Sequence, residues 1–309
     1  MKCNILVAAV CAVLALSSYR TAFAVVVAGD NNQNVNGTAG SVPAGFNYWA
    51  SVGSFGSGAS VYVGNGWAIS ANHLGSSTTT INGITYTIDQ TSVLTNPNDS
   101  SPTDLKMLHL QIDNAHPLPS VAVPAIASTS PSQNDLILDI GRGRDRSSAF
   151  SQTYNSTFSG PTPAVYTGYA LSAAQDMRWG NNLVSSASTQ YVGYGAGGTA
   201  PFVASFIADF TQFGGQSSEF QLAPGDSGGG VFRQVGGVWQ LTGINIAAGT
   251  FANQNPGTSA VFGQTSYMAD LSVYRSQIMT FVPEPSTFVL AGCAAGVAVI
   301  AGARRRSRR

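Results

Sequence analysis

Short apolar runs, broken at close intervals by glycine, asparagine and proline, limit what this chain of 309 residues can fold into. The apolar residues in these runs alternate or cluster as they do in β-strands, and the 35 glycines favour turns between them. In Asp270–Phe281 the apolar residues instead have helical spacing, at Leu271, Tyr274, Ile278 and Phe281. The sequence therefore predicts an all-β protein with a short helix near its C-terminal end.

The predicted strands form two groups of similar size, in residues 25–132 and 133–281. Pro117–Gln133 is rich in proline, which disrupts sheet pairing, and in serine, which favours turns. We therefore expect a connector there, between an N-terminal and a C-terminal β unit.

Charged residues and cysteines are unevenly distributed along the chain. The formal net charge is zero, but residues 25–281 hold seven basic against thirteen acidic residues, so the folded region is mildly acidic. No basic stripe for nucleic acid is present in it. Cys3, Cys11 and Cys293 all lie in the terminal segments, which excludes a disulfide within the folded region. We expect its stability to come from hydrophobic packing.

Residues 1–24 have the features of a signal peptide. Lys2 precedes the apolar run Ile5–Leu16, and Ala22-Phe23-Ala24 has small residues at the two positions that signal peptidase recognises. We expect export and cleavage after Ala24. An uncleaved membrane anchor is the alternative, but the apolar run is short for that purpose.

Residues 282–309 contain Pro283-Glu284-Pro285, an apolar stretch over Thr287–Ala303 and an arginine-rich end. The stretch is long enough to cross a thin bilayer as a transmembrane helix, with the arginines in the cytoplasm. This arrangement resembles the PEP-CTERM sorting signal of Gram-negative bacteria. The resemblance implies recognition by an exosortase, removal of the helix, and delivery to the cell surface or an extracellular matrix. Membrane contact through the helix would then be limited to the time before processing.

Pro224–Gly230 carries the strongest chemical signal, Pro-Gly-Asp-Ser-Gly-Gly-Gly, directly before a predicted strand. A serine hydroxyl is a weak nucleophile that needs a neighbouring base, and its attack creates an oxyanion that needs preorganised donors. Glycines around Ser227 let backbone N–H groups approach that oxygen closely. A plain Gly/Ser turn is the alternative, but the order of the residues favours a nucleophile.

A nucleophilic serine needs a base, and the chain has three histidines. His73 follows an apolar strand that ends in small residues, whereas His109 lies inside a predicted strand and His116 precedes a proline in a turn. We therefore predict His73 as the base. Asp104, at the start of an apolar run, is the acid predicted to orient the imidazole. Asp99 is the alternative acid, but its asparagine and serine neighbours favour a turn-forming role.

Three segments resemble the motifs of the chymotrypsin- and trypsin-like serine peptidases: Ser70–His73, Asp104–Leu108 and Gly225–Gly229. They occur in that family's order of histidine, aspartate and serine, which differs from the order in subtilisins and α/β-hydrolases. The resemblance covers roughly residues 45–281, strongly at the motifs and loosely between them. It implies two antiparallel six-stranded β-barrels, with the active site in the cleft between them.

The resemblance also implies a role for each residue. Ser227 would attack a peptide carbonyl, His73 would pass the proton to the leaving amine, and Asp104 would orient His73. The N–H groups of Gly225 and Ser227 would bind the oxyanion. The implied protein is a secreted endopeptidase that acts on peptides or proteins without a cofactor or metal. Its substrate-binding positions are Gln221, Ile244 and Ile246.

Two positions bear on the specificity and the maturation of such a peptidase. Gln221 stands where the family usually sets specificity, and its neutral amide offers no charge to Lys or Arg, so we expect small, apolar or polar side chains to be preferred. Cleavage after Ala24 would free the amino group of Val25, which by resemblance to digestive relatives would pair with Asp226. Alternatively, Asp226 accepts local backbone N–H bonds as a structural residue.

Two other functions fit parts of the sequence. A non-catalytic matrix or adhesion protein would use the same fold as a binding surface, which the sorting segment and the Asn/Ser/Thr-rich composition favour. A serine esterase would use the same nucleophile on a different substrate. Gly141–Arg146 has three arginines that could attract an anion, but a solvated loop is the favoured interpretation.

Overall fold

The computed structural model describes residues 25–28, 42–155, 163–193, 201–211, 218–251, 254 and 257–282. Strands dominate these residues, which also contain the 3-10 helix η1 (Trp49–Ser51) and the α-helix α1 (Leu271–Phe281). The predicted all-β class with a short C-terminal helix is confirmed. The predicted signal peptide and the sorting segment beyond Val282 lie outside the described residues. Within them, no helix has the length and apolar character needed to span a bilayer.

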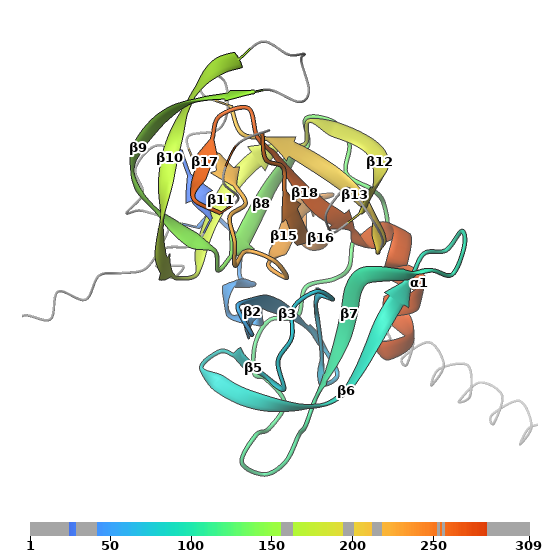
Figure 1. Ribbon diagram of the computed structural model, residues 1–309. Coiled ribbons are helices and arrows are strands. Elements are labelled where there is room, and N and C mark those ends of the chain that lie inside the picture. The colour runs from blue at the N-terminus through green and yellow to red at the C-terminus, as the bar shows by residue number, and fades with distance from the viewer. Residues whose placement is uncertain are drawn as a thin grey trace, which may run out of the picture.

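The first unit is a closed barrel of six antiparallel strands in the order β2-β3-β4-β7-β6-β5 (Figure 1). Pairing of Ser54 with Thr80 joins β2 to β5 and closes it. Gly53 permits this closure, because a Cβ there would lie only 2.1 Å from the carbonyl oxygen of Thr80. The barrel predicted for this part of the chain is confirmed. Its strands are β2 (Val52–Phe55), β3 (Gly58–Gly64), β4 (Trp67–Ala71), β5 (Thr78–Ile81), β6 (Ile84–Thr95) and β7 (Pro102–Leu110).

The second unit is built on an open seven-stranded sheet in the order β11-β8-β15-β16-β18-β13-β12, rather than on the predicted closed six-stranded barrel. Its strands are β8 (Leu136–Gly141), β11 (Arg178–Leu183), β12 (Ser186–Gly193), β13 (Phe202–Asp209), β15 (Gly230–Val235), β16 (Val238–Ala248) and β18 (Thr265–Asp270).

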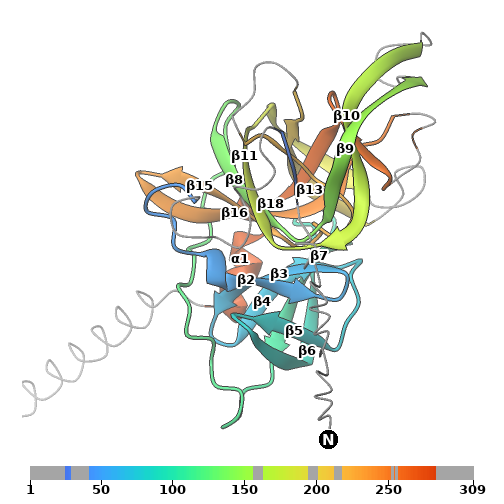
Figure 2. The ribbon, with the colours of Figure 1, turned by 90° about the vertical axis from the view of Figure 1, so that its left-hand side faces the viewer.

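The long strands β9 (Arg144–Asn155) and β10 (Pro163–Gln175) explain why this sheet does not close. They pair with each other and with β17 (Ser259–Val261) in a separate three-stranded sheet. The β9–β10 pairing contains two register shifts, and Figure 2 shows the two strands as a curved ribbon that extends away from the first barrel. The second unit is therefore a half-barrel with an added sheet.

The start of the described chain also belongs to the second unit. β1 (Val26–Val27) pairs antiparallel with β14 (Phe220–Gln221), although it precedes the first barrel in sequence. The side chains of Val25, Val26 and Val27 are all buried. The residue that would follow the predicted cleavage site is thus packed inside the second unit.

Helix α1 and a shared apolar core join the two units. The hydroxyl of Tyr274 donates to Asn96 Oδ1 (2.8 Å), which follows β6, and accepts from the N–H of Ala204 (2.7 Å) in β13. Figures 1 and 2 show α1 beside both units where they meet. One cluster of buried apolar side chains runs from Ile69 in the first barrel to Phe232 in the second unit. Of the four positions with helical spacing, Leu271, Tyr274 and Ile278 are buried, whereas Phe281 at the end of the helix is half-buried.

Candidate active site

His73 and Asp104 lie together at one edge of the first barrel. Ala71, at the end of β4, pairs with Leu105 in β7, so the turn after β4 lies beside Asp104. Asp104 Oδ2 is 2.7 Å from His73 Nδ1, and Asp104 Oδ1 accepts the backbone N–H of His73 at 2.8 Å. The Asp104 side chain is fully buried, whereas that of His73 is 14% exposed. With a proton on Nδ1 facing the carboxylate, Nε2 is left as an acceptor.

The other histidines and the alternative acid lie in different surroundings. His109 pairs with Asp89 (Nδ1 to Oδ1, 2.6 Å) and His116 with Asp113 (3.0 Å), and both pairs are at the surface. Asp99 accepts the backbone N–H of Ser101 two residues further on, at 2.9 Å, as expected for a turn-former.

A lysine that the sequence analysis did not single out supports the His73 turn. Lys106 Nζ donates to the carbonyl oxygens of Asn72 (3.3 Å) and Leu74, the two neighbours of His73. It also lies 4.9 Å from the centre of the Phe55 ring. Burial lowers the pKa of Lys106, while the nearby Asp104 carboxylate opposes that shift. No motif indicates this role, because it follows from the pairing of β4 with β7.

The Ser227 turn has an unusual set of backbone donors. The N–H groups of Asp226, Gly228 and Gly229 donate to backbone carbonyls. By contrast, no described residue accepts the N–H of Gly225 or Ser227, the two groups predicted to bind an oxyanion. Gly225 has φ +101°, in a region that other residues rarely adopt, so the turn requires glycine there.

This turn rests on the first barrel, next to the strand that leads to His73. The carbonyl oxygen of Ser227 accepts the N–H of Ala59 at 2.8 Å. A Cβ on Gly58 would lie 2.4 Å from that oxygen and 2.7 Å from Leu74 Cδ1. The backbone of Ser227 and the residue after His73 therefore meet at one glycine, which brings the segments of all three predicted triad residues together.

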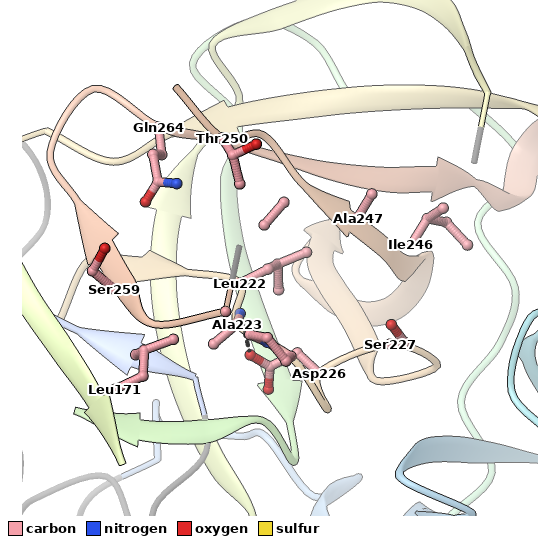
Figure 3. Close-up of a pocket in the computed structure, with 13 residues that line it drawn as sticks. Leu171, Leu222, Ala223, Asp226, Ser227, Ile246, Ala247, Thr250, Ser259 and Gln264 are labelled. Carbon is pink, nitrogen blue, oxygen red and sulfur yellow. Dashed lines mark hydrogen bonds between the residues drawn. The ribbon is translucent and has the colours of Figure 1, made fainter. Parts of the chain in front are cut away.

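A pocket of about 270 Å³ opens beside Ser227 (Figure 3). Gln264, Ser259 and Leu171 lie at the end away from Ser227. Asp226 is the one ionisable residue among those that line the pocket. The pocket is thus largely apolar, with a few neutral polar groups. Its lining also includes Leu222, Ala223, Ile246, Ala247, Ala248 and Thr250.

Of the three predicted substrate-binding residues, one lines the pocket and two do not. Ile246 lines the pocket, whereas Gln221 and Ile244 do not. Gln221 is fully buried in β14, and its Nε2 donates to the carbonyl oxygen of Leu222 at 3.3 Å. Leu171 and Gln264 were not anticipated, because they come from distant parts of the chain and carry no motif.

Asp226 points away from Ser227 into a buried site. Its Oδ1 accepts the N–H groups of Gly143 (2.6 Å) and Val25 (3.2 Å), and its Oδ2 accepts that of Ala223 (2.8 Å). Burial raises the pKa of Asp226 to about 7, and the three backbone N–H donors reduce the shift. A Cβ on Gly141 would lie 2.1 Å from Oδ1, so this glycine makes room for the carboxylate.

Val25 has a strained backbone in this position. Its φ is +47°, which is a rare conformation for a β-branched residue. A residue with a free amino group has no preceding carbonyl to clash with, so cleavage before Val25 would remove this strain. The observed bond from the Val25 nitrogen to Asp226 is compatible with both interpretations of Asp226, the structural acceptor and the partner of an ammonium group.

Comparison with known proteins adds no family assignment. No protein-family model matches the chain, and no curated protein matches it in sequence. Among the described residues, no group of three or more His, Cys, Asp or Glu side chains is placed to hold a metal ion. The interpretation of the site therefore depends on its own geometry and on the three motifs.

The raised pKa of Asp226 predicts how stability depends on pH when Ala24 remains joined to Val25. Between the ordinary pKa of 3.8 and about 7, the folded state holds a proton that the unfolded state has lost. Unfolding free energy should therefore decrease as pH rises through this window, by on the order of 4 kcal/mol. Denaturant unfolding across this pH range measures it. In Asp226→Asn this contribution should vanish, and an unchanged pH dependence in that variant would contradict the assignment.

Proposed function

We propose that the chain is an exported serine endopeptidase of the chymotrypsin-like type, with Ser227 as nucleophile, His73 as base and Asp104 as orienting acid. The observation that carries the proposal is the two-point contact of Asp104 with the imidazole and backbone of His73, at the barrel edge where the Ser227 turn rests. The two-unit β fold is consistent with that family.

In the proposed reaction, His73 Nε2 takes the proton of Ser227 as its Oγ attacks the peptide carbonyl. The Asp104 carboxylate then stabilises the imidazolium through Nδ1. The N–H groups of Gly225 and Ser227, which no described residue accepts, donate to the oxyanion of the tetrahedral intermediate. The imidazolium gives its proton to the leaving amine, and water hydrolyses the acyl-enzyme by the same steps in reverse roles.

The pocket beside Ser227 supports a preference for uncharged side chains. Its lining has no ionisable group except Asp226, whose carboxylate already accepts three backbone N–H bonds. A lysine or arginine side chain would be desolvated there without a free counter-charge, which is costly. A volume of about 270 Å³ could hold any single side chain, so the chemistry of the lining rather than its size would set the preference.

Maturation follows from the same proposal. Signal peptidase would cleave after Ala24 during export, and the new ammonium group of Val25 would pair with the buried Asp226 carboxylate. The sorting segment would direct the protein through an exosortase to the cell surface or extracellular matrix of a Gram-negative bacterium.

Replacement of the nucleophile tests the mechanism. Ser227→Ala should fold normally, lose labelling by a fluorophosphonate probe and lose peptide hydrolysis by about four orders of magnitude, because the attacking oxygen is absent. Ser120→Ala, at an exposed serine of the connector, is the matched control and should keep both activities. An unlabelled wild-type protein would favour a non-catalytic binding protein, and hydrolysis of simple esters without peptides would favour an esterase.

Cleavage of a peptide library by the purified mature protein tests the pocket. We expect small, apolar or neutral polar residues before the cleaved bond, because the lining offers no free charge. A profile dominated by lysine and arginine would contradict this expectation.

A short extension tests the role of the Val25 amino group. Insertion of Ala-Ser between Ala24 and Val25, with cleavage still after Ala24, replaces the ammonium at Asp226 by a neutral amide. We expect peptide hydrolysis to fall at least tenfold at pH 8, because the buried carboxylate loses its counter-charge. Full activity of the extended protein would exclude the ammonium pair and leave Asp226 as a structural acceptor.

A further inference from the structure

A second buried carboxyl group, that of Asp139 in β8, lies behind the Ser227 turn. It faces Asn245 in β16, and both residues are fully buried. The backbone of Asn245 holds the turn at two points: its carbonyl accepts the N–H of Gly228 (2.9 Å), and its N–H donates to the carbonyl of Gly229 (3.0 Å). Asn245 is thus bonded through its backbone to the two residues that follow the candidate nucleophile.

One hydrogen bond joins these two side chains, and a second polar atom on each is left to be explained. Asn245 Nδ2 donates to Asp139 Oδ1 at 2.7 Å. Among the described residues, neither Asp139 Oδ2 nor Asn245 Oδ1 has a hydrogen-bond partner, and neither atom is accessible to solvent. If Asp139 is ionised, both atoms are acceptors without a donor, and each unsatisfied buried acceptor is destabilising. A carboxyl group and an amide joined through one bond can also bring their two remaining atoms together when their planes align.

We propose that Asp139 is held as the neutral acid and that its Oδ2–H donates to Asn245 Oδ1, which closes a two-bond acid–amide pair behind the Ser227 turn. One proton satisfies both atoms at once, since a protonated carboxyl group is a donor and an acceptor. Asp139 is then a positioning residue, which acts on Ser227 through Asn245.

The electrostatic surroundings agree with a neutral acid. Burial raises the pKa of Asp139 well above its usual value, and the charge of Asp226 raises it further. The Asn245 amide and the neighbouring backbone N–H of Ile140 oppose these effects. An ionised Asp139 would place a second negative charge near Asp226 in a site without solvent, whereas the neutral pair adds none.

Infrared spectroscopy of the mature protein at neutral pH tests the proton directly. Wild type should show a C=O stretching band of a protonated carboxylic acid that disappears in Asp139→Asn. The matched control is Asp135→Asn, because the partly exposed Asp135 carboxylate lies 2.9 Å from the Arg233 guanidinium and should contribute no such band. Absence of a band that depends on Asp139 would overturn the proposal.

Two substitutions separate a neutral hydrogen-bonding role from a charged one. Asp139→Asn keeps a donor and an acceptor in the same shape. Its melting temperature should therefore stay close to that of wild type, and its kcat/KM should stay within about threefold. Asp139→Leu leaves the Asn245 amide unsatisfied and should lower the melting temperature and reduce kcat/KM about tenfold or more. Equal damage by both substitutions would overturn the proposal.

The activity measurement rests on the proposed peptidase function, but the infrared and melting measurements do not. If wild type hydrolyses no peptide, the proposed function fails while the band and the two melting temperatures still decide whether the acid–amide pair exists.

Discussion

The buried carboxylate of Asp226 is the interaction on which the candidate site depends. Three backbone N–H groups, from Val25, Gly143 and Ala223, converge on it and fix the turn that carries Ser227. Neutral amides compensate only part of the cost of burying a negative charge, and this is why its pKa rises to about 7. A positive charge at the Val25 nitrogen would supply the missing part without moving an atom. The order of the Ser227 turn would therefore depend on whether the chain is cleaved before Val25.

The relative position of His73 and Ser227 is determined by contacts between backbones rather than by long side chains. A Cβ on Gly228 would lie 2.0 Å from the carbonyl oxygen of Ala59, and one on Gly58 would collide with Ser227. Flexible side chains would allow the units to slide, but direct backbone contacts admit little movement. This close fit, with α1 and the shared core, replaces the disulfides that the folded region cannot form.

Local motifs were sufficient to predict the pairing of His73 with Asp104, and periodicity predicted the buried face of α1. The outer part of the second unit was not predictable in this way, because its closure depends on where β9 and β10 pair, which no local pattern fixes. Gln221 shows a second reason why parts of the site could not be predicted from the sequence. Successive side chains of an extended segment point to opposite sides, so Leu222 lines the pocket while Gln221 faces the interior. The family resemblance pointed to a residue next to the pocket-lining Leu222 but gave no direction for its side chain.

Three buried aspartates belong to the candidate site or to the residues that support it, and each requires a different form of compensation. Asp104 contacts an imidazole that becomes cationic in the proposed reaction, and Asp226 contacts the nitrogen that becomes cationic after cleavage before Val25. Asp139 contacts a neutral amide from Asn245. A carboxyl group in a site of low dielectric stays charged only where a cation or several donors balance it. The nitrogens of His73 and Val25 therefore determine how many of these carboxyl groups can stay charged. Asp139 has no such partner among the described residues, which favours its neutral, hydrogen-bonding form.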